Sequence, residues 1–169
     1  MTTKAAATEI TTADSANALN HLALYLHIPF CSAKCGYCDF NSYEHLDHLV
    51  PEYTPALINE IDLWAAATKQ HTITSIFFGG GTPSLTSIED LKAIISKIRE
   101  RFSIDPNAEW TLEANPSELT EEHLIGMRAI GINRLSIGVQ SMHADELQLL
   151  DRQHSAERVV EAVTMARTA

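Results

Sequence analysis

Hydrophobic and polar positions along the chain follow one pattern four times: a short apolar run typical of a strand, then a loop, then a longer amphipathic run typical of a helix. The strand candidates are LALYLHI at 22–28, ITSIFF at 73–78, EWTLEA at 109–114 and RLSIGVQ at 134–140. The first and the last two alternate apolar and polar residues. The second is almost continuously apolar, as in a strand buried on both faces.

The amphipathic stretches between and after these strands predict helices at Pro55–Thr68, Ser87–Phe102, Glu121–Ile130 and Ala156–Ala166. The clearest begins at Ser87, a residue suited to cap the N terminus of a helix. Strands that alternate with helices predict an α/β fold of parallel βα repeats. A closed eight-stranded barrel needs about 250 residues, so four units predict an open sheet or an incomplete barrel. We expect the chain to be a fragment of a longer protein.

The charge balance narrows the classes of partner. Lys and Arg number 12 against 22 Asp and Glu, a formal net charge of −10, which argues against nucleic acid. No apolar stretch is long enough to span a bilayer. Residues 1–21 are rich in Thr and Ala and lack an apolar signal sequence, so they are expected to be a disordered tail before a domain at 22–169. The predicted compartment is the cytoplasm.

All three cysteines lie in one short segment, CSAKCGYCDF, with the spacing C-x3-C-x2-C. In a reducing compartment, clustered cysteines bind metal more often than they form disulfides. An iron–sulfur cluster held by three thiolates would leave one iron open to an exogenous ligand. A structural zinc site would need a fourth ligand. The candidates for that ligand are His27, Asp39, His45 and His48. A disulfide would leave one cysteine unpaired. The spacing favours the cluster and leaves the other two interpretations open.

Other distinctive polar positions lie at or after the ends of the predicted strands, where parallel α/β folds place their ligand sites. GGGTPS at 79–84 follows the second strand, Glu113 closes the third and Gln140 closes the fourth. Arg152 follows a short helix later. Glycines without side chains let the backbone approach a ligand closely.

Several of the candidate positions also have a simple structural interpretation. The glycines could form a plain turn, and Gln140 could cap a loop. Arg152 could be a solvated residue paired with Asp151 or Glu157. Tyr25 could be a strand aromatic at the edge of the core.

The cysteine motif, with Tyr37 before the third cysteine, resembles the signature of the radical S-adenosylmethionine (SAM) superfamily. The segments LYLHIPFCSAKCGYCDFNSY, FFGGGTPSL, LEANP and GINRLSIGVQS resemble the HemW haem chaperone family, which is related to oxygen-independent coproporphyrinogen III oxidase. The resemblance runs from about Leu22 to the end of the chain. It implies that residues 22–169 are the N-terminal part of a radical SAM core domain, an incomplete TIM-like barrel.

The resemblance also implies a set of cofactors and ligands. A 4Fe–4S cluster would be held by Cys31, Cys35 and Cys38, with the amino and carboxylate groups of SAM on the open iron. In such families the reduced cluster cleaves SAM to release a deoxyadenosyl radical. The positions that match SAM-contacting residues are Tyr25, Tyr37, Gly80, Gly81, Thr82, Glu113, Gln140 and Arg152. No catalytic residue is assigned.

Three functions from different classes remain open at this point. The first is a chaperone that binds haem and transfers it to client proteins, with the haem attachment site beyond residue 169 in the longer parent. The second is a coproporphyrinogen oxidase that decarboxylates propionates, and the third is an inactive remnant. The oxidase pattern has a further cysteine two positions after the third motif cysteine, where this chain has Phe40. The resemblance therefore favours the chaperone and leaves radical enzyme activity open.

Overall fold

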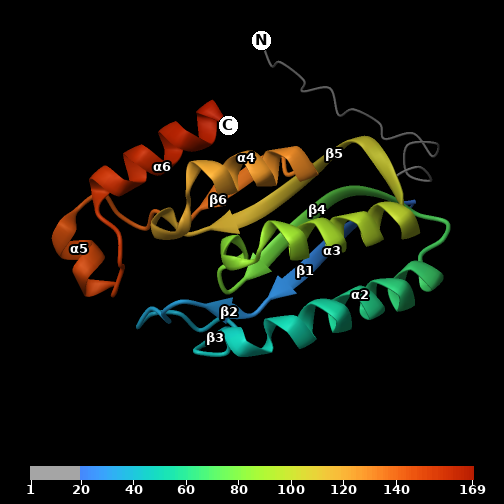
Figure 1. The fold of residues 1–169 in the computed structure, drawn as a ribbon, viewed down its shortest axis with the longest axis horizontal. Helices are drawn as coiled ribbons and strands as arrows, with labels where there is room; N and C mark the ends of the chain where they lie inside the picture. Colours follow the sequence, from blue (N-terminus) through green and yellow to red (C-terminus); the bar gives the residue numbers. More distant parts are fainter. Residues whose placement is uncertain (1–19) are drawn as a thin grey trace, which may run out of the picture.

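A parallel sheet with a layer of helices makes up the part of the chain that the computed structural model describes, residues 20–169 (Figure 1). The sheet has the order β1-β4-β5-β6, and every neighbouring pair is parallel. Its strands are β1 (His21–Ile28), β4 (Thr72–Gly80), β5 (Ser103–Ala114) and β6 (Arg134–Ile137). The main helices are α2 (Val50–Ala67), α3 (Ile88–Arg101), α4 (Glu121–Ile130) and α6 (Ala156–Thr168). The predicted parallel βα repeats are confirmed.

Short elements decorate the ends of these strands. A second, two-stranded parallel sheet pairs β2 (Phe30–Cys31) with β3 (Tyr43–Glu44). Three single turns of 3-10 helix are η1 (Asp47–Leu49), η2 (Pro83–Leu85) and η3 (Pro116–Glu118), and α5 (Ala144–Leu149) precedes α6. Most of these elements follow the carboxyl ends of β1, β4, β5 and β6, so the irregular parts of the chain gather at one edge of the sheet.

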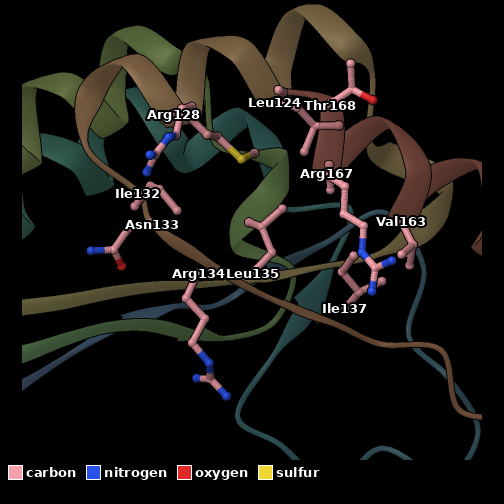
Figure 2. Close-up of a pocket in the computed structure, with 13 residues that line it drawn as sticks. Leu124, Arg128, Ile132, Asn133, Arg134, Leu135, Ile137, Val163, Arg167 and Thr168 are labelled. Atoms are coloured by element: carbon pink, nitrogen blue, oxygen red, sulfur yellow. The ribbon is translucent and has the colours of Figure 1, made fainter.

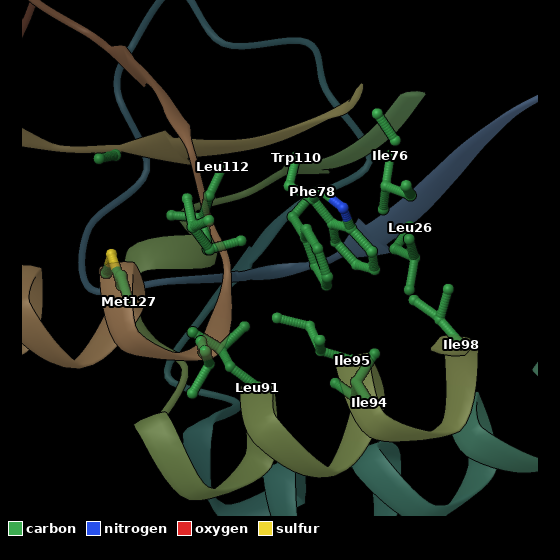
Figure 3. Packing of buried hydrophobic residues seen from close by; sticks show 14 of the residues in the cluster. Leu26, Ile76, Phe78, Leu91, Ile94, Ile95, Ile98, Trp110, Leu112 and Met127 are labelled. Carbon is green, nitrogen blue, oxygen red and sulfur yellow. The ribbon is translucent and has the colours of Figure 1, made fainter. Parts of the chain in front are cut away.

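The hydrophobic core lies between the sheet and the helices (Figure 3). The predicted apolar stripe of α3 supplies much of it, and its buried members are Leu91, Ile94, Ile95 and Ile98, each at most 1% exposed. They pack with apolar side chains of β1, β4 and β5, among them Leu26, Phe78 and Leu112. Removing apolar surface from water is the largest favourable contribution to folding. The core therefore fixes the strands, and with them the strand ends that carry the polar residues.

The ends of α3 and α4 follow the local rules of helix capping. Ser87 Oγ accepts a hydrogen bond from Asp90 N–H at 3.0 Å, which confirms Ser87 as the N-cap of α3. Gly131 closes α4 with a left-handed backbone at φ 110°. Glycine adopts this conformation without the steric cost that a Cβ would bring.

Several predicted boundaries are wrong, each for a local reason. Helix α2 begins at Val50 instead of Pro55, because Pro51 occupies the first turn, where a missing N–H costs nothing. Strand β5 begins at Ser103, six residues early, because the pairing with β4 shifts register around 105–108 and the strand passes through Pro106. Strand β6 ends at Ile137, so Gln140 follows the strand rather than closing it.

The predicted tail at residues 1–21 ends slightly too late. His21 already pairs with Thr72 at the start of β1, and Asn20 O accepts a hydrogen bond from Thr72 N–H at 2.8 Å. The remainder of the predicted disordered tail, residues 1–19, lies outside the described residues.

Along β6, an outer strand of the sheet, lies a cavity of about 530 Å³ (Figure 2). Its lining comes from β6 and from the facing sides of α4 and α6, including Leu135, Leu124 and Val163. Within residues 20–169, β6 pairs with β5 alone, so this cavity runs beside an unpaired strand edge. No helix of the described part is long and apolar enough to cross a membrane.

Candidate functional site

The cysteine loop, residues 31–42, is held closed at its base. Tyr43 N–H donates to Pro29 O at 2.7 Å where β3 meets the start of β2. Lys34 Nζ donates to the carbonyls of Phe40 and Ser42 at 3.3 and 3.0 Å. An ammonium group that donates to two carbonyls fixes both, so Lys34 ties the two arms of the loop together. No spacing pattern in the sequence signals this role.

The three cysteines are free thiols, and all three line one cavity. Cys35 Sγ accepts a hydrogen bond from Arg152 Nη1 at 3.2 Å, and Cys38 Sγ lies 3.8 Å from Ser42 Oγ. Among the described residues, no three His, Cys, Asp or Glu side chains already converge as a metal site. The three thiols thus share a cavity, and Cys35 and Cys38 hydrogen-bond to different partners within it.

The glycine stretch at the end of β4 is joined to the segment that leads into Cys31. Gly81 N–H donates to Ile28 O and Thr82 N–H donates to Phe30 O, both at 2.7 Å. A Cβ added to Gly81 would lie 2.5 Å from Phe30 O, closer than real Cβ contacts. Gly80 has φ 117°, a conformation that favours glycine. A plain turn would not need this fit, so the stretch serves to bring β4 and the cysteine loop together.

Glu113, at the end of β5, lies against the same glycines. Its Oε2 accepts a hydrogen bond from Gly80 N–H at 3.1 Å. The carboxylate keeps its other oxygen, Oε1, for a further donor. Glu113 is therefore held in the cavity wall and presents a negative charge there.

Arg152 connects three parts of the site. In addition to its contact with Cys35, its Nη2 donates to Gly138 O at 2.8 Å and to Asn115 Oδ1 at 3.4 Å. These contacts join the cysteine loop to the segments after β5 and β6. The interpretation of Arg152 as a solvated residue paired with Asp151 or Glu157 does not describe these contacts. The role of Asn115 as a partner of Arg152 has no signal in the sequence, because it depends on side chains 37 residues apart.

These groups surround a single cavity of about 500 Å³ at the carboxyl ends of the strands. Its lining includes ten of the eleven residues singled out in the sequence: Cys31, Cys35, Tyr37, Cys38, Gly80, Gly81, Thr82, Glu113, Gln140 and Arg152. Phe40 and Asn115 line it as well. Burial raises the pKa of the Tyr37 phenol, with Arg152 opposing and Cys35 adding to the shift. Tyr37 is therefore a neutral phenol that can donate a hydrogen bond near pH 7.

Tyr25 is the one candidate that the structure does not bring into the cavity lining. Its ring stacks on Phe77 of β4 with centroids 6.1 Å apart, and its hydroxyl lies 3.0 Å from His27 Nδ1. The side chain is 60% exposed. A Cβ on Gly79 would come within 3.0 Å of both the Tyr25 ring and Glu113, so Tyr25 lies just below the cavity wall.

The donor set of the cavity fits an iron–sulfur cluster better than zinc. Three thiols line it, and within the described chain no His and no Asp does. His27 is engaged elsewhere, because its Nε2 lies 2.7 Å from Asn41 O. Glu113, the one carboxylate that residues 20–169 place in the lining, already accepts from Gly80. A structural zinc ion would therefore have to take the free oxygen of Glu113 as its fourth ligand, whereas a cluster with one open iron needs only three thiolates. Arg152 Nε, a buried donor without a partner among the described residues, leaves a further group for a bound anion.

His154 is a buried imidazole behind this cavity. Its Nε2 lies 2.9 Å from Val139 O, and because a carbonyl can only accept, Nε2 carries the proton. Burial lowers its pKa from the ordinary 6.5, the Val139 hydrogen bond opposes this, and Arg152 lowers it further. His154 is therefore neutral near pH 7.

This shift predicts an acid-sensitive contribution to stability. Below pH 6.5 the unfolded chain binds a proton on His154 that the folded protein does not bind. The free energy of unfolding therefore decreases as the pH is lowered. The slope from this one group is at most about 1.4 kcal/mol per pH unit. Urea denaturation between pH 7.5 and 5.5 is expected to be less pH-dependent in His154→Gln than in the wild type. Parallel profiles would contradict the assignment.

Comparison with known proteins identifies the class to which this fold and site belong. The sequence matches the Radical SAM superfamily over residues 25–169, and the chain is a member of that superfamily. It is 39% identical to the heme chaperone HemW of Escherichia coli over 147 residues, which cover 86% of this chain and 39% of that protein. It is 41% identical to HemW of Mycobacterium tuberculosis, over 85% of this chain and 37% of that protein.

A solved structure with the same architecture is the radical SAM enzyme coproporphyrinogen III oxidase, HemN, from Escherichia coli. It superimposes with a TM-score of 0.82 at 29% identity, over 94% of this chain and 38% of that one. The predicted fold, a partial TIM-like radical SAM barrel, is confirmed. The chain spans about two fifths of the length of these relatives.

Proposed function

We propose that the cavity at the carboxyl ends of the strands binds a 4Fe–4S cluster through Cys31, Cys35 and Cys38, with SAM beside it. The observation that carries this proposal is the shared lining: three thiols, a glycine wall and the side chains of Glu113, Gln140 and Arg152 surround one cavity. Membership of the radical SAM superfamily supports the same pair of cofactors. When bound, the cluster supplies the electron for cleaving SAM.

Different residues of the cavity would bind different parts of SAM. Arg152 offers a guanidinium to the carboxylate of the methionine part, and its Nε, unpartnered within residues 20–169, adds a donor. The free oxygen of Glu113 accepts from an ammonium or a ribose hydroxyl. Gly80 and Gly81 let the backbone approach the ligand because they carry no side chain. Tyr37 donates from a neutral phenol, and Gln140 presents an amide from the turn after β6.

We further propose that the longer protein containing this chain is a cytoplasmic haem chaperone that binds haem and passes it to client proteins. The similarity to HemW from two bacteria supports this function. The alternative, an oxidase of the HemN type, is supported by the fold but lacks the further cysteine expected at the position of Phe40. Phe40 lines the cavity and is 61% exposed, so an apolar ring takes that place.

The two functions predict opposite results for the longer protein after anaerobic cluster assembly. For the chaperone, haem titration shifts the Soret band in a saturable way, and coproporphyrinogen III incubated with SAM and reductant is recovered unchanged. For the oxidase, the incubation yields protoporphyrinogen, which is oxidised in air to protoporphyrin and then measured by fluorescence after chromatography. Formation of protoporphyrinogen would overturn the chaperone proposal. Absence of both activities would favour an inactive remnant.

A further inference from the structure

The turn after β6 places Gln140 in an unusual backbone conformation beside the ligand cavity. Gln140 has φ 64°, in the left-handed region that non-glycine residues seldom adopt. Gln140 is the central residue of a three-residue turn, in which Ser141 N–H donates to Val139 O at 2.8 Å. A turn of the same kind comes directly before it, in which Val139 N–H donates to Ile137 O at 2.9 Å. Such a conformation persists only where neighbouring contacts determine it, and it is common at functional sites.

Arg152 and His154 hold this turn through hydrogen bonds to the carbonyls of two successive residues. Arg152 Nη2 donates to Gly138 O at 2.8 Å, and His154 Nε2 donates to Val139 O at 2.9 Å. The Val139 carbonyl is part of the peptide group that joins Val139 to Gln140. The angle φ of Gln140 sets how this peptide group is rotated relative to the rest of Gln140. The imidazole therefore holds the group that sets the left-handed conformation.

The surroundings of His154 keep its imidazole neutral, with Nε2 as the hydrogen-bond donor. The side chain is 6% exposed, and its Nδ1 is buried without a hydrogen-bond partner among the described residues. With Nε2 committed to Val139 O, Nδ1 carries the lone pair of the neutral ring. A proton on Nδ1 would be buried without an acceptor and near the positive charge of Arg152. His154 is thus a fixed neutral donor.

Gly138 makes room for the side chains that this turn directs at the cavity. A Cβ at that position would lie 3.3 Å from Gln140 Nε2 and 3.5 Å from Arg152 Nη2. Both side chains therefore lie against the bare backbone of Gly138, and both line the cavity. The conformation of the turn and the direction of the Gln140 amide are coupled.

We propose that His154 is a positioning residue that acts through Gln140: by holding the Val139 carbonyl, it fixes the left-handed turn that presents the Gln140 amide to SAM. This inference rests on the proposed binding of SAM in the cavity. His154 itself does not line the cavity, so its effect on the ligand passes through the turn.

Two isosteric variants test the proposal in the chain after anaerobic cluster assembly. In His154→Gln the amide nitrogen takes the place of Nε2 and can donate to Val139 O. In His154→Asn the side chain is shorter, so its amide nitrogen takes the place of Nδ1 and does not reach Val139 O. Equilibrium dialysis with labelled SAM is expected to show about tenfold weaker binding for His154→Asn, the loss that one misplaced ligand hydrogen bond causes. His154→Gln is expected to stay within about threefold of the wild type, the scale of a retained hydrogen bond.

A double-variant cycle separates positioning from general destabilisation. In a Gln140→Ala background, His154→Asn is expected to weaken SAM binding less than about twofold, because the amide it positions is gone. Amide hydrogen exchange of residues 138–141, measured without SAM, is expected to accelerate in His154→Asn and not in His154→Gln. This second readout does not depend on the ligand.

The outcomes distinguish the inference from the function on which it rests. Binding of SAM by the wild type with additive effects of the two substitutions overturns the positioning role of His154 and leaves the proposed function standing. Failure of the reconstituted wild type to bind SAM overturns the proposed function, and with it the claim that Gln140 serves SAM. Equal exchange in the two His154 variants overturns the coupling between His154 and the turn in either case.

Discussion

Replacing Cys35 with serine is expected to abolish assembly of the iron–sulfur cluster. Among the described residues, three thiols are the only sulfur donors in the cavity lining, so the loss of one leaves two donors for a cluster that needs three. A serine oxygen is a hard, weakly acidic ligand that does not replace a thiolate on iron. Iron and acid-labile sulfide, measured after anaerobic assembly and gel filtration, are expected to fall to background.

Ser32→Ala is the matched control for this substitution. Ser32 follows Cys31 directly in the same loop, and its hydroxyl donates to Glu118 at the exposed side of the loop. It does not line the cavity, so the variant is expected to bind the wild-type amount of iron. A full complement of iron and sulfide in Cys35→Ser would contradict the proposed ligand set.

Substitution of Gly81 by alanine is expected to be the most destabilising change in the glycine stretch. The added Cβ would lie 2.5 Å from Phe30 O and 2.9 Å from the carbonyl carbons of Pro29 and Phe30. These are backbone atoms directly before Cys31, so the segment that carries the first thiol has to move. We expect the free energy of unfolding to fall by about 3 kcal/mol, the upper end for overpacking, measured from urea denaturation midpoints.

Gly36→Ala provides a comparison within the cysteine loop itself. A Cβ on Gly36 would meet Asp151 Oδ2 at 2.5 Å, and this atom is the far end of a side chain that can rotate away. Its cost is expected to be below about 1 kcal/mol, as for ordinary exposed positions. Equal stability of Gly81→Ala and Gly36→Ala would mean that the glycine stretch does not fix the cysteine loop.

Much of the fold could be predicted because local pattern and tertiary packing agree. The alternation in β1 and the stripe of α3 each have a single face that can be buried, so their residues fix the element and its orientation. The boundaries failed where tertiary contacts override local signals. The predicted third strand begins at Glu109, yet Asn107 N–H bonds to Asp105 Oδ1 within a bulge and β5 already starts at Ser103.

The candidate site was predictable in its residues and not in its contacts. The cysteine spacing and the polar residues at strand ends point to one edge of a parallel sheet, and ten of these residues share one cavity. The sequence carries no signal for the bond between Arg152 and Cys35, which joins residues 117 positions apart. It likewise gives no sign that His154 is buried behind the turn at Gln140, because a lone histidine has no spacing partner.

Electron paramagnetic resonance of the reduced, anaerobically assembled chain, recorded with and without SAM, tests whether the three thiols hold a cluster that binds SAM. We expect the signal of a reduced 4Fe–4S cluster, and we expect SAM to change that signal, because SAM would bind the one iron that lacks a thiolate. A chain that retains only zinc after assembly, or a cluster whose signal is the same with and without SAM, would contradict this proposal.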